Sequence, residues 1–424
     1  MKILNPKYLI TSFFILLFVL FFWNLDIFRN IAKKYLPSEV KIFVKSKIFG
    51  EKYLDEITFF KISNYNQKTL PNTQFIKLNF KKEKMENFNA GVENYYNILN
   101  NQKAPLKKKF YIEVINDEIY LLDSTGLLIK INNFSSFKIE KVKNNIKDLK
   151  SLDIKDLHFL DGDIFITYAF EVKKNCNVLK IAKANINNSS LVFKNFFTPK
   201  ECNHNIIAGK MGTFEMNKKK GLIVTTGSDG MGEKKYAQLD DSIYGKILFF
   251  DLDTKNFKII SKGHRNPQGL YVYKNMILST EHGPKGGDEI NLIQSGKNYG
   301  WPVSSYGEPY SFEYKKKGKY EYFKNHSMNE FKEPVYSFVP SIGISQIIKI
   351  PKNFSPLWED NFLVSSLNGR SLFRIKFDKN FEKVIYREKI IIGERIRDMV
   401  YLKKHNMILV ALEDSGSLGL IKAE

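Results

Sequence analysis

Residues 110–131 read FYIEVINDEIYLLDSTGLLIKI, and this stretch decides the fold class. It contains three short apolar runs, 110–115, 118–123 and 127–131, with Asn, Asp and Gly at the reversals between them. Short runs rich in Ile, Leu, Val and Tyr are typical of β-strands, and Asn, Asp and Gly tolerate the positive φ of tight turns. The stretch therefore predicts three consecutive strands joined by tight turns.

The same pattern recurs along the chain. Further strands are predicted at residues 163–168, 178–182, 221–226, 246–251, 362–366, 372–376 and 407–411. Many short strands with little helix favour an all-β sandwich, barrel or propeller. The roughly 315 residues from Phe110 to the C-terminus would supply about six blades, at about 50 residues for each four-stranded blade.

A long apolar run precedes this β-rich body. Lys2 and Lys7 come before residues 8–25, a run close to the roughly 20 residues that a membrane-spanning helix needs. A cleaved signal peptide would have a shorter apolar region and a small-residue cleavage site, and no such site follows. We predict an uncleaved signal anchor over 1–30, a membrane-proximal region over 31–109 and the propeller over 110–424. The N-terminal lysines favour a single-pass inner-membrane protein with its propeller on the periplasmic or extracytoplasmic side.

Charge and cysteine content narrow the functional classes. The formal net charge is +21, but the lysine clusters are scattered and no nucleic-acid-binding motif accompanies them, so we predict no nucleic-acid partner. A basic domain is attracted to anionic lipid, which agrees with a membrane location. The chain has two cysteines, Cys176 and Cys202. In an oxidising compartment they are expected to pair and close a loop of about 25 residues; the alternative is two buried thiols.

Two segments are dense in residues that suit a functional site: GHRNPQGL (263–270) and EHGPKGGDEI (281–290). Gly and Pro hold unusual backbone conformations, while Arg, Asn, His, Asp and Glu supply donors, acceptors and metal ligands. Loops at one end of a propeller converge on its axis, so His204, Arg265, Gly283 and Arg395 could meet in one pocket. Arg395 and Arg397 alternate along a predicted strand, which puts both on one face; a merely charged strand face is the alternative.

These segments resemble the glucose/sorbosone dehydrogenase family, which includes soluble quinoprotein glucose dehydrogenases and aldose sugar dehydrogenases that use pyrroloquinoline quinone (PQQ). The resemblance runs from about Asn203 to the C-terminus. Its segments follow the family's order: AQLDDSIYGKILFFDLD (237–253), GHRNPQGL (263–270), STEHGPKGGDEINLIQSGKNYGWP (279–302), EPVYSFVPSIGIS (333–345), NFLVSSLNGRSLFRI (361–375) and GERIRDMVY (393–401). The resemblance independently implies a six-bladed propeller.

The resemblance also implies a role for individual residues. His204 is the expected general base, a task that suits a neutral imidazole. Arg265 is expected to bind and polarise the quinone, because a guanidinium makes forked bonds to carboxylate and quinone oxygens, and His264 is expected to support its loop. The other residues expected to bind PQQ are Asn266, Arg395, Arg397 and Asn368.

The resemblance implies metal sites as well. Gly283 and Pro284 stand where the family offers backbone carbonyls to the Ca²⁺ that holds PQQ, and calcium prefers such hard oxygen ligands. Asp288 and Glu289 match acidic residues that help to bind a second calcium in some members. A polar loop at the start of a strand is the alternative for these two.

Two departures from the family fall on cofactor contacts. PQQ-binding members usually have Lys where Asn368 stands, although Arg370 lies nearby. The family's early Gly-Leu-Leu-Gly-like blade is also not legible, and the nearest stretch is 152–158.

The function predicted is a membrane-anchored, PQQ- and calcium-dependent dehydrogenase for a small-molecule sugar of the aldose or sorbosone type. In it His204 takes the proton of the C1 hydroxyl and hydride moves to PQQ. The sugar and the electron acceptor are not specified by any motif. One alternative is a non-catalytic propeller that has lost PQQ and serves in binding or envelope assembly. Another is a calcium-dependent hydrolase or lactonase.

Overall fold

The computed structural model describes residues 76–85, 92–93, 96–97, 102–103, 107–134, 137–149, 153–173, 176–203, 206–228, 236–309 and 322–424. All of them belong to one compact unit, Gln74–Glu424. The predicted anchor over 1–30, and most of the region predicted over 31–109, lie outside the described residues. No helix in the described ranges is long and apolar enough to cross a membrane.

The described residues form six antiparallel four-stranded sheets, and five of these use strands that are consecutive in the chain. These strands are β6 (Phe110–Ile115), β7 (Glu118–Asp123), β8 (Leu128–Asn133), β9 (Lys138–Lys141); β10 (Asp153–Leu160), β11 (Asp163–Lys173), β12 (Cys176–Asn185), β13 (Lys194–Phe197); β14 (Ala208–Met216), β15 (Lys219–Thr226), β16 (Lys246–Asp251), β17 (Phe257–Lys262); β18 (Pro267–Tyr273), β19 (Met276–Glu281), β20 (Asp288–Leu292), β21 (Tyr336–Phe338); β22 (Ile344–Lys349), β23 (Asn361–Ser366), β24 (Ser371–Phe377) and β25 (Val384–Ile391).

Short elements connect these strands along the chain. They are the paired strands β2 (Val92–Glu93) and β5 (Lys107–Lys108), the paired strands β3 (Tyr96–Asn97) and β4 (Gln102–Lys103), and the 3₁₀ helices η2 (Ile146–Leu149), η3 (Tyr236–Gln238), η4 (Ser327–Asn329), η5 (Pro356–Trp358) and η6 (Lys403–His405).

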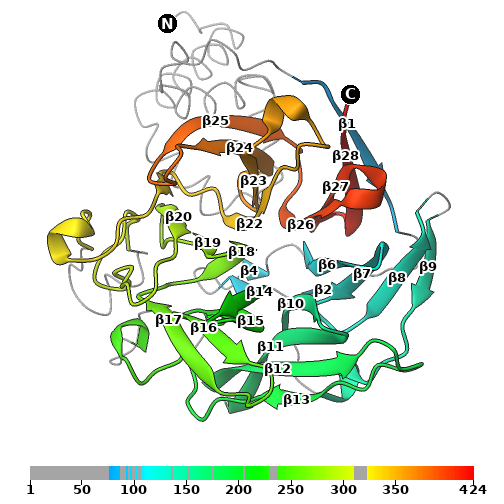
Figure 1. Cartoon of the computed structure of the whole chain (residues 1–424), viewed down its shortest axis with the longest axis horizontal. Helices are drawn as coiled ribbons and strands as arrows, with labels where there is room; N and C mark the ends of the chain where they lie inside the picture. Colours follow the sequence, from blue (N-terminus) through cyan, green and yellow to red (C-terminus); the bar gives the residue numbers. More distant parts are fainter. Residues whose placement is uncertain are drawn as a thin grey trace, which may run out of the picture. The chain divides into compact units, whose positions relative to one another are not determined.

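The sixth sheet joins the two ends of the described chain. Its strands β26 (Ile396–Leu402), β27 (Met407–Leu412) and β28 (Ser417–Ala423) come from the C-terminus, and β1 (Leu78–Glu83) pairs antiparallel with β28 along the outer edge (Figure 1). The sequence predicts that the propeller starts at residue 110. The propeller begins earlier, because β1 lies in the range 31–109 that was assigned to the membrane-proximal region.

The innermost strands close a ring. Strands β6, β10, β14, β18, β22 and β26 contact one another in this order, β26 contacts β6, and the sheets are arranged around them as blades (Figure 1). This arrangement confirms the predicted all-β fold and the predicted six-bladed β-propeller.

The core consists of apolar layers between neighbouring blades. Every residue of β23 is buried, because a middle strand faces another blade on each side. Phe362 packs with Leu278 of the preceding blade, whereas its neighbour Leu363 packs with Ile408 of the following blade. The period-two alternation of strand side chains thus divides one apolar run between two layers.

The innermost strands of five blades carry a β-bulge near their first residues. The register shifts between Ile154 and Asp156, Ala208 and Met211, Pro267 and Gly269, Ile344 and Ile347, and Ile396 and Met399. The residues that these shifts skip are polar or glycine: Lys155, Gly209, Lys210, Gln268, Ser345, Gln346, Arg397 and Asp398. A bulge leaves a residue unpaired in the ladder and re-aims its side chain. The repeated bulge therefore gives the inner ring a set of polar residues.

Candidate functional site

Two arginines at the start of β26 share one buried carboxylate. Arg395 Nε donates to Glu413 Oε2 at 2.9 Å, and Arg397 Nε donates to Glu413 Oε1 at 2.5 Å. Burial disfavours the ionised form of Glu413, but the two guanidinium charges outweigh burial and lower the pKa of Glu413 to about 2. The two arginines lie together, as predicted, and with one carboxylate between them they retain a net positive charge.

A chain of amide contacts connects this pair to the GHRNPQGL loop. Arg397 Nη1 donates to Gln268 Oε1 at 3.1 Å, and Gln268 Nε2 donates to Asn266 Oδ1 at 2.8 Å. The backbone N–H of His282 donates to the Asn266 carbonyl at 3.1 Å. Asn266 and Arg397 therefore belong to one network, and their predicted role in binding a cofactor stays a prediction. The analysis of the sequence did not single out Gln268, although it lies within the same octamer.

Arg265 is half-buried and directed at the second sequence block. Its Nη1 donates to the carbonyl oxygens of His282 at 3.1 Å and Gly283 at 2.9 Å, and its guanidinium carbon lies 5.2 Å from the centre of the Trp301 ring. Among the described residues, its buried Nε has no hydrogen-bond acceptor. Arg265 therefore retains a donor for a further acceptor.

Glu281 fixes the backbone of the Arg265 loop. Its Oε1 accepts the backbone N–H groups of Arg265 and, at 3.3 Å, Asn266. Its Oε2 lies 3.0 Å from Nδ1 of the fully buried His264, whose Nε2 lies 2.9 Å from the Ser261 hydroxyl. This geometry confirms that His264 supports the loop.

The predicted carbonyl ligands Gly283 and Pro284 lie in a tight loop. A Cβ on Gly283 would lie 2.3 Å from the carbonyl oxygens of Gly286 and Gly287, so only glycine fits. Pro284 is buried. Burial and the nearby arginines lower the pKa of the adjacent His282 to about 4, so this imidazole is neutral at neutral pH. The Gly283 carbonyl accepts from Arg265, which places it opposite a positive group.

Asp288 is fully buried and accepts three backbone N–H groups. Its Oδ1 accepts from Gly283 at 3.1 Å, and its Oδ2 accepts from Ile342 at 3.0 Å and Ile344 at 2.9 Å. The carboxylate therefore joins the Gly283 loop to the start of β22 in the next blade. Its predicted role in metal binding stays a prediction.

Glu289 borders a small cavity of about 10 Å³ together with Glu281, Tyr299 and Ser304. This volume holds about one water molecule. Burial and the negative charge of Glu281 raise the pKa of Glu289 well above its usual range. Glu281 and Glu289 thus bring two buried carboxyl groups to one cavity. Within the described ranges, no group of three or more His, Cys, Asp or Glu residues is placed to hold a metal.

The loop around Asn368 carries less charge than the family pattern. Asn368 is exposed, and its backbone N would lie 2.9 Å from a Cβ on Gly343. Arg370 pairs with Asp414 at 3.1 Å and donates to the Gly393 carbonyl at 3.2 Å. Both contacts use Nη1 of Arg370.

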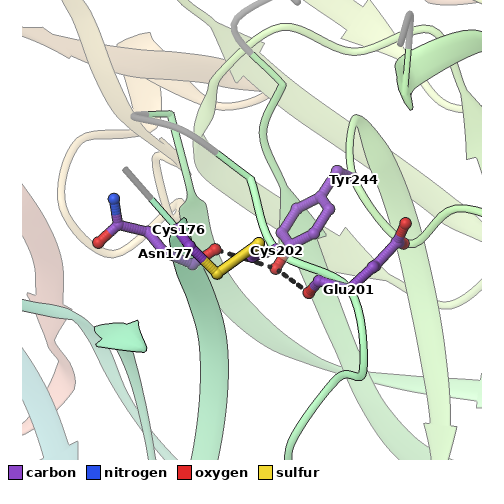
Figure 2. The surroundings of a disulfide bond; sticks show 5 residues. All are labelled: Cys176, Asn177, Glu201, Cys202 and Tyr244. Carbon is purple, nitrogen blue, oxygen red and sulfur yellow. Dashed lines mark hydrogen bonds between the residues drawn. A yellow bond between two sulfur atoms is a disulfide. The ribbon is translucent and has the colours of Figure 1, made fainter. Parts of the chain in front are cut away.

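His204 lies outside the described residues, but the residue before it is held firmly. Cys176 and Cys202 form the predicted disulfide, with Cα atoms 5.2 Å apart, and Tyr244 Oη lies near the carbonyl oxygens of Asn177 and Glu201 (Figure 2). Asn203 pairs with Asn177 through both backbone groups. Asn203 Nδ2 also donates to the carbonyls of Ile206 at 2.7 Å and Gly227 at 2.9 Å.

Comparison with known proteins finds similarity to sugar dehydrogenases. The sequence profile of the Glucose / Sorbosone dehydrogenase family matches residues 156–421. Aldose sugar dehydrogenase YliI of Escherichia coli is 32% identical over 165 residues, which cover 38% of this chain and 43% of that protein. Quinoprotein glucose dehydrogenase B of Acinetobacter calcoaceticus is 26% identical over 237 residues, which cover 41% of this chain and 49% of that protein. The chain spans less than half the length of these relatives.

Solved structures share the fold. The soluble aldose sugar dehydrogenase from Escherichia coli, in its apo form, superposes with a TM-score of 0.63 at 19% identity. The match covers 82% of this chain and 99% of that structure. At this identity the likeness concerns the propeller alone.

Proposed function

Because the chain belongs to the glucose/sorbosone dehydrogenase family, we propose that it is a sugar dehydrogenase dependent on PQQ and calcium. The observation that carries the proposal is the cationic network of Arg265, Arg395 and Arg397, which the inner ends of two blades bring together through Gln268 and Asn266. A family profile over residues 156–421, an aldose sugar dehydrogenase and a quinoprotein among the relatives all support it.

The residues fit a polyanionic quinone. PQQ is a tricarboxylate with an ortho-quinone, and guanidinium groups make strong charge-assisted bonds to such oxygens. Arg395 and Arg397 retain a net positive charge beside Glu413, and Arg265 has a buried Nε without an acceptor among the described residues. When bound, PQQ supplies a two-electron acceptor that takes hydride from the sugar carbon.

The chain's own residues have separate tasks in this proposal. Arg395 and Arg397 bind carboxylates of the cofactor, Asn266 and Asn368 add polar contacts, and Arg265 donates to a quinone oxygen. His204 accepts the proton of the C1 hydroxyl, a role that suits a neutral imidazole at neutral pH.

Calcium binding is part of the proposal. The carbonyl oxygens of His282 and Gly283 converge on the Arg265 guanidinium, so they already face a positive group. Calcium takes carbonyl and carboxylate oxygens. Gly283 and Pro284 are the proposed ligands for the cofactor's calcium, and Glu289 is the proposed ligand for a second ion beside the cavity of about 10 Å³. The Asp288 carboxylate accepts three backbone N–H groups, including that of Gly283, and so positions the Gly283 loop. Asp288 is therefore less available than Glu289 as a calcium ligand.

The proposal includes a membrane location. Residues 8–25 are apolar enough to anchor the chain in the inner membrane, and the propeller then lies on the periplasmic or extracytoplasmic side. A disulfide between Cys176 and Cys202 suits an oxidising compartment. Electrons then leave the sugar near the membrane, where an acceptor of the respiratory chain is within reach.

A non-catalytic binding propeller is the second candidate. The observation that favours it is the loop of Asn368, which has no charge and whose neighbour Arg370 is paired with Asp414. A propeller that had lost PQQ would tolerate this change. The three arginines of the network favour the enzyme instead, because a scaffold has no need of a cationic cluster that includes a buried unpaired donor.

Calorimetric titration of the full-length protein in detergent with PQQ, in the presence and absence of Ca²⁺, tests the proposal. We expect calcium-dependent binding that weakens by about tenfold or more in Arg265→Ala and Arg397→Ala. Lys219→Ala is the control, since Lys219 is exposed and pairs with Asp251 on a hairpin of another blade. Absence of binding at micromolar PQQ with calcium would favour the non-catalytic propeller.

A further inference from the structure

A second group of cations lies on the two blades that the family motifs do not mark. Lys109 Nζ bonds to Asp153 Oδ1 at 2.7 Å, and Lys155 Nζ pairs with Asp153 Oδ2. Two ammonium groups therefore share one carboxylate, as the two arginines share Glu413. The lysine side chains are 6% and 17% exposed, whereas Asp153 is 33% exposed, so the cluster opens on its carboxylate side.

The backbone places this lysine cluster beside the arginine pair. Lys108 N donates to the Glu413 carbonyl at 2.8 Å, so the chain enters β6 alongside the residue that holds Arg395 and Arg397. Ile112 N donates to Asp398 Oδ2 at 3.0 Å, which joins β6 directly to β26, the strand that carries Arg397.

Lys155 lies at a β-bulge, as do two residues of the candidate site, Gln268 and Arg397. It is the residue skipped by the bulge of β10, as Gln268 is in β18 and Arg397 is in β26. A bulge leaves the skipped residue unpaired in the ladder and re-aims its side chain. Lys155 therefore belongs to the ring of polar residues that already includes Gln268 and Arg397.

Tyr111 provides an independent link between the two cationic groups. Its ring is buried, and Lys109 Nζ lies 5.8 Å from the ring centre. Burial raises the pKa of the Tyr111 phenol, while the charges of Lys109 and Arg397 both oppose that rise. The two cations therefore act on the same phenol.

Asp153 is ionised between the two lysines. Burial disfavours the Asp153 carboxylate, but the two lysines outweigh burial and hold the pKa of Asp153 below its usual range. Among the contacts of the described residues, two ammonium groups therefore face one carboxylate. Asn368 supplies no charge on its loop, so the lysine cluster is an additional source of positive charge near the inner ring.

We propose that Lys109 and Lys155 form a further anion-binding subsite of this site, which holds a carboxylate of the bound ligand in competition with Asp153. The identity of the ligand as PQQ rests on the proposed function. The subsite itself requires only a polycarboxylate, because paired ammonium groups recognise a carboxylate by charge and hydrogen bonding.

Four variants of the full-length protein test the subsite by calorimetry with PQQ and Ca²⁺. Lys109→Met and Lys155→Met remove one charge each and keep most of the unbranched side chain, and we expect each to weaken binding by about tenfold. Asp153→Asn removes the competing carboxylate, and we expect binding to tighten by about threefold. Lys219→Met is the matched control, since Lys219 also pairs with an aspartate but on an exposed hairpin, and its affinity should equal that of the wild type.

The opposite sign of the aspartate variant separates ligand binding from structural support. If the cluster only stabilised the fold, Asp153→Asn would lower the melting temperature without tightening binding. Equal PQQ affinity in Lys109→Met, Lys155→Met and the wild type would overturn the proposal.

A parallel titration with citrate, a tricarboxylate that has no quinone, separates the subsite from the enzyme. One outcome is that PQQ does not bind, while citrate binds and its affinities rank the variants in the expected order. In that case the proposed function fails and the subsite stands. If the wild type binds neither molecule, the subsite is overturned as well.

Discussion

Arg397 Nε lies 2.5 Å from Glu413 Oε1, so the cation in the middle of the site is held by a carboxylate from the next strand of its own blade. Arg395 uses the other oxygen of Glu413. The Glu413 carboxylate thus bridges two guanidinium groups. Its single negative charge fixes them without cancelling both positive charges. The remaining Nη1 of Arg397 reaches Gln268 on another blade. A single buried glutamate therefore sets the position of the cationic group for which we propose a cofactor role.

Replacement of Glu413 should destabilise the protein strongly. Glu413→Gln leaves two partly buried arginines without their counter-charge, and breaking a buried ion pair in this way costs about 3–5 kcal/mol. Urea unfolding of the variant and the wild type measures the difference. Glu424→Gln is the control, since Glu424 is exposed and pairs with Lys77, and it should change the stability little. A Glu413→Gln protein as stable as the wild type would show that the arginines do not depend on this carboxylate.

The same glutamate predicts a pH dependence of stability. Its pKa is lowered from 4.5 to about 2, so the ionised form stabilises the folded state above pH 4.5, and this contribution is lost as the pH falls toward 2. The shift corresponds to about 3 kcal/mol. The free energy of unfolding, measured from pH 5 downward to about pH 2, should fall more steeply in the wild type than in Glu413→Gln. Parallel curves for the two proteins would contradict the assigned pKa.

The disulfide should contribute to stability. Cys176 and Cys202 are 26 residues apart, and closing a loop of this size contributes about 3 kcal/mol in the chain-entropy model. The double variant Cys176→Ser/Cys202→Ser should therefore unfold at a lower urea concentration. Thiol labelling of the denatured, unreduced wild type should find no free cysteine. Two labelled thiols in protein purified from an oxidising compartment would contradict the pairing.

Glu281 should affect cofactor binding without touching the cofactor. In Glu281→Gln one carboxylate oxygen becomes an NH₂ group, which cannot accept, so the loop loses either the bonds from Arg265 and Asn266 at Oε1 or the contact with His264 at Oε2. We expect PQQ affinity to fall by about tenfold, because the Arg265 loop loses its fixed position. Glu359→Gln, at an exposed pair with Lys352, is the control and should bind as the wild type does. Unchanged affinity in Glu281→Gln would show that the loop is held by other contacts.

The blades were predictable from the sequence because their middle strands are apolar on both faces. The stretch 110–131 contains β6 and β7 at their observed bounds and most of β8. Strand β1 was not predicted, because its six residues, LNFKKE, are mostly exposed along the outer edge of a blade and only Leu78 and Phe80 are apolar. Its role depends on pairing with β28 at the far end of the chain, which no local pattern reports.

The site was predictable to the extent that it is carried by contiguous motifs. Arg265, Asn266, Arg395 and Arg397 were identified in this way, and the structure joins them through Gln268. Glu413 was missed because its role comes from a tertiary contact with residues 16 and 18 positions earlier. Lys155 was missed because a β-bulge, which has no signature in the sequence here, places it among the inner polar residues.

The central claim is tested most directly by sugar oxidation. Full-length protein loaded with PQQ and Ca²⁺ is incubated with a panel of aldoses and an artificial electron acceptor, and reduction of the acceptor is followed together with formation of the oxidised sugar. We predict turnover of at least one aldose in the wild type. In His204→Asn we expect a loss of about 100-fold or more in kcat with PQQ affinity retained. A loaded protein that binds PQQ and oxidises no sugar, or a His204→Asn variant with the wild-type rate, would contradict the account.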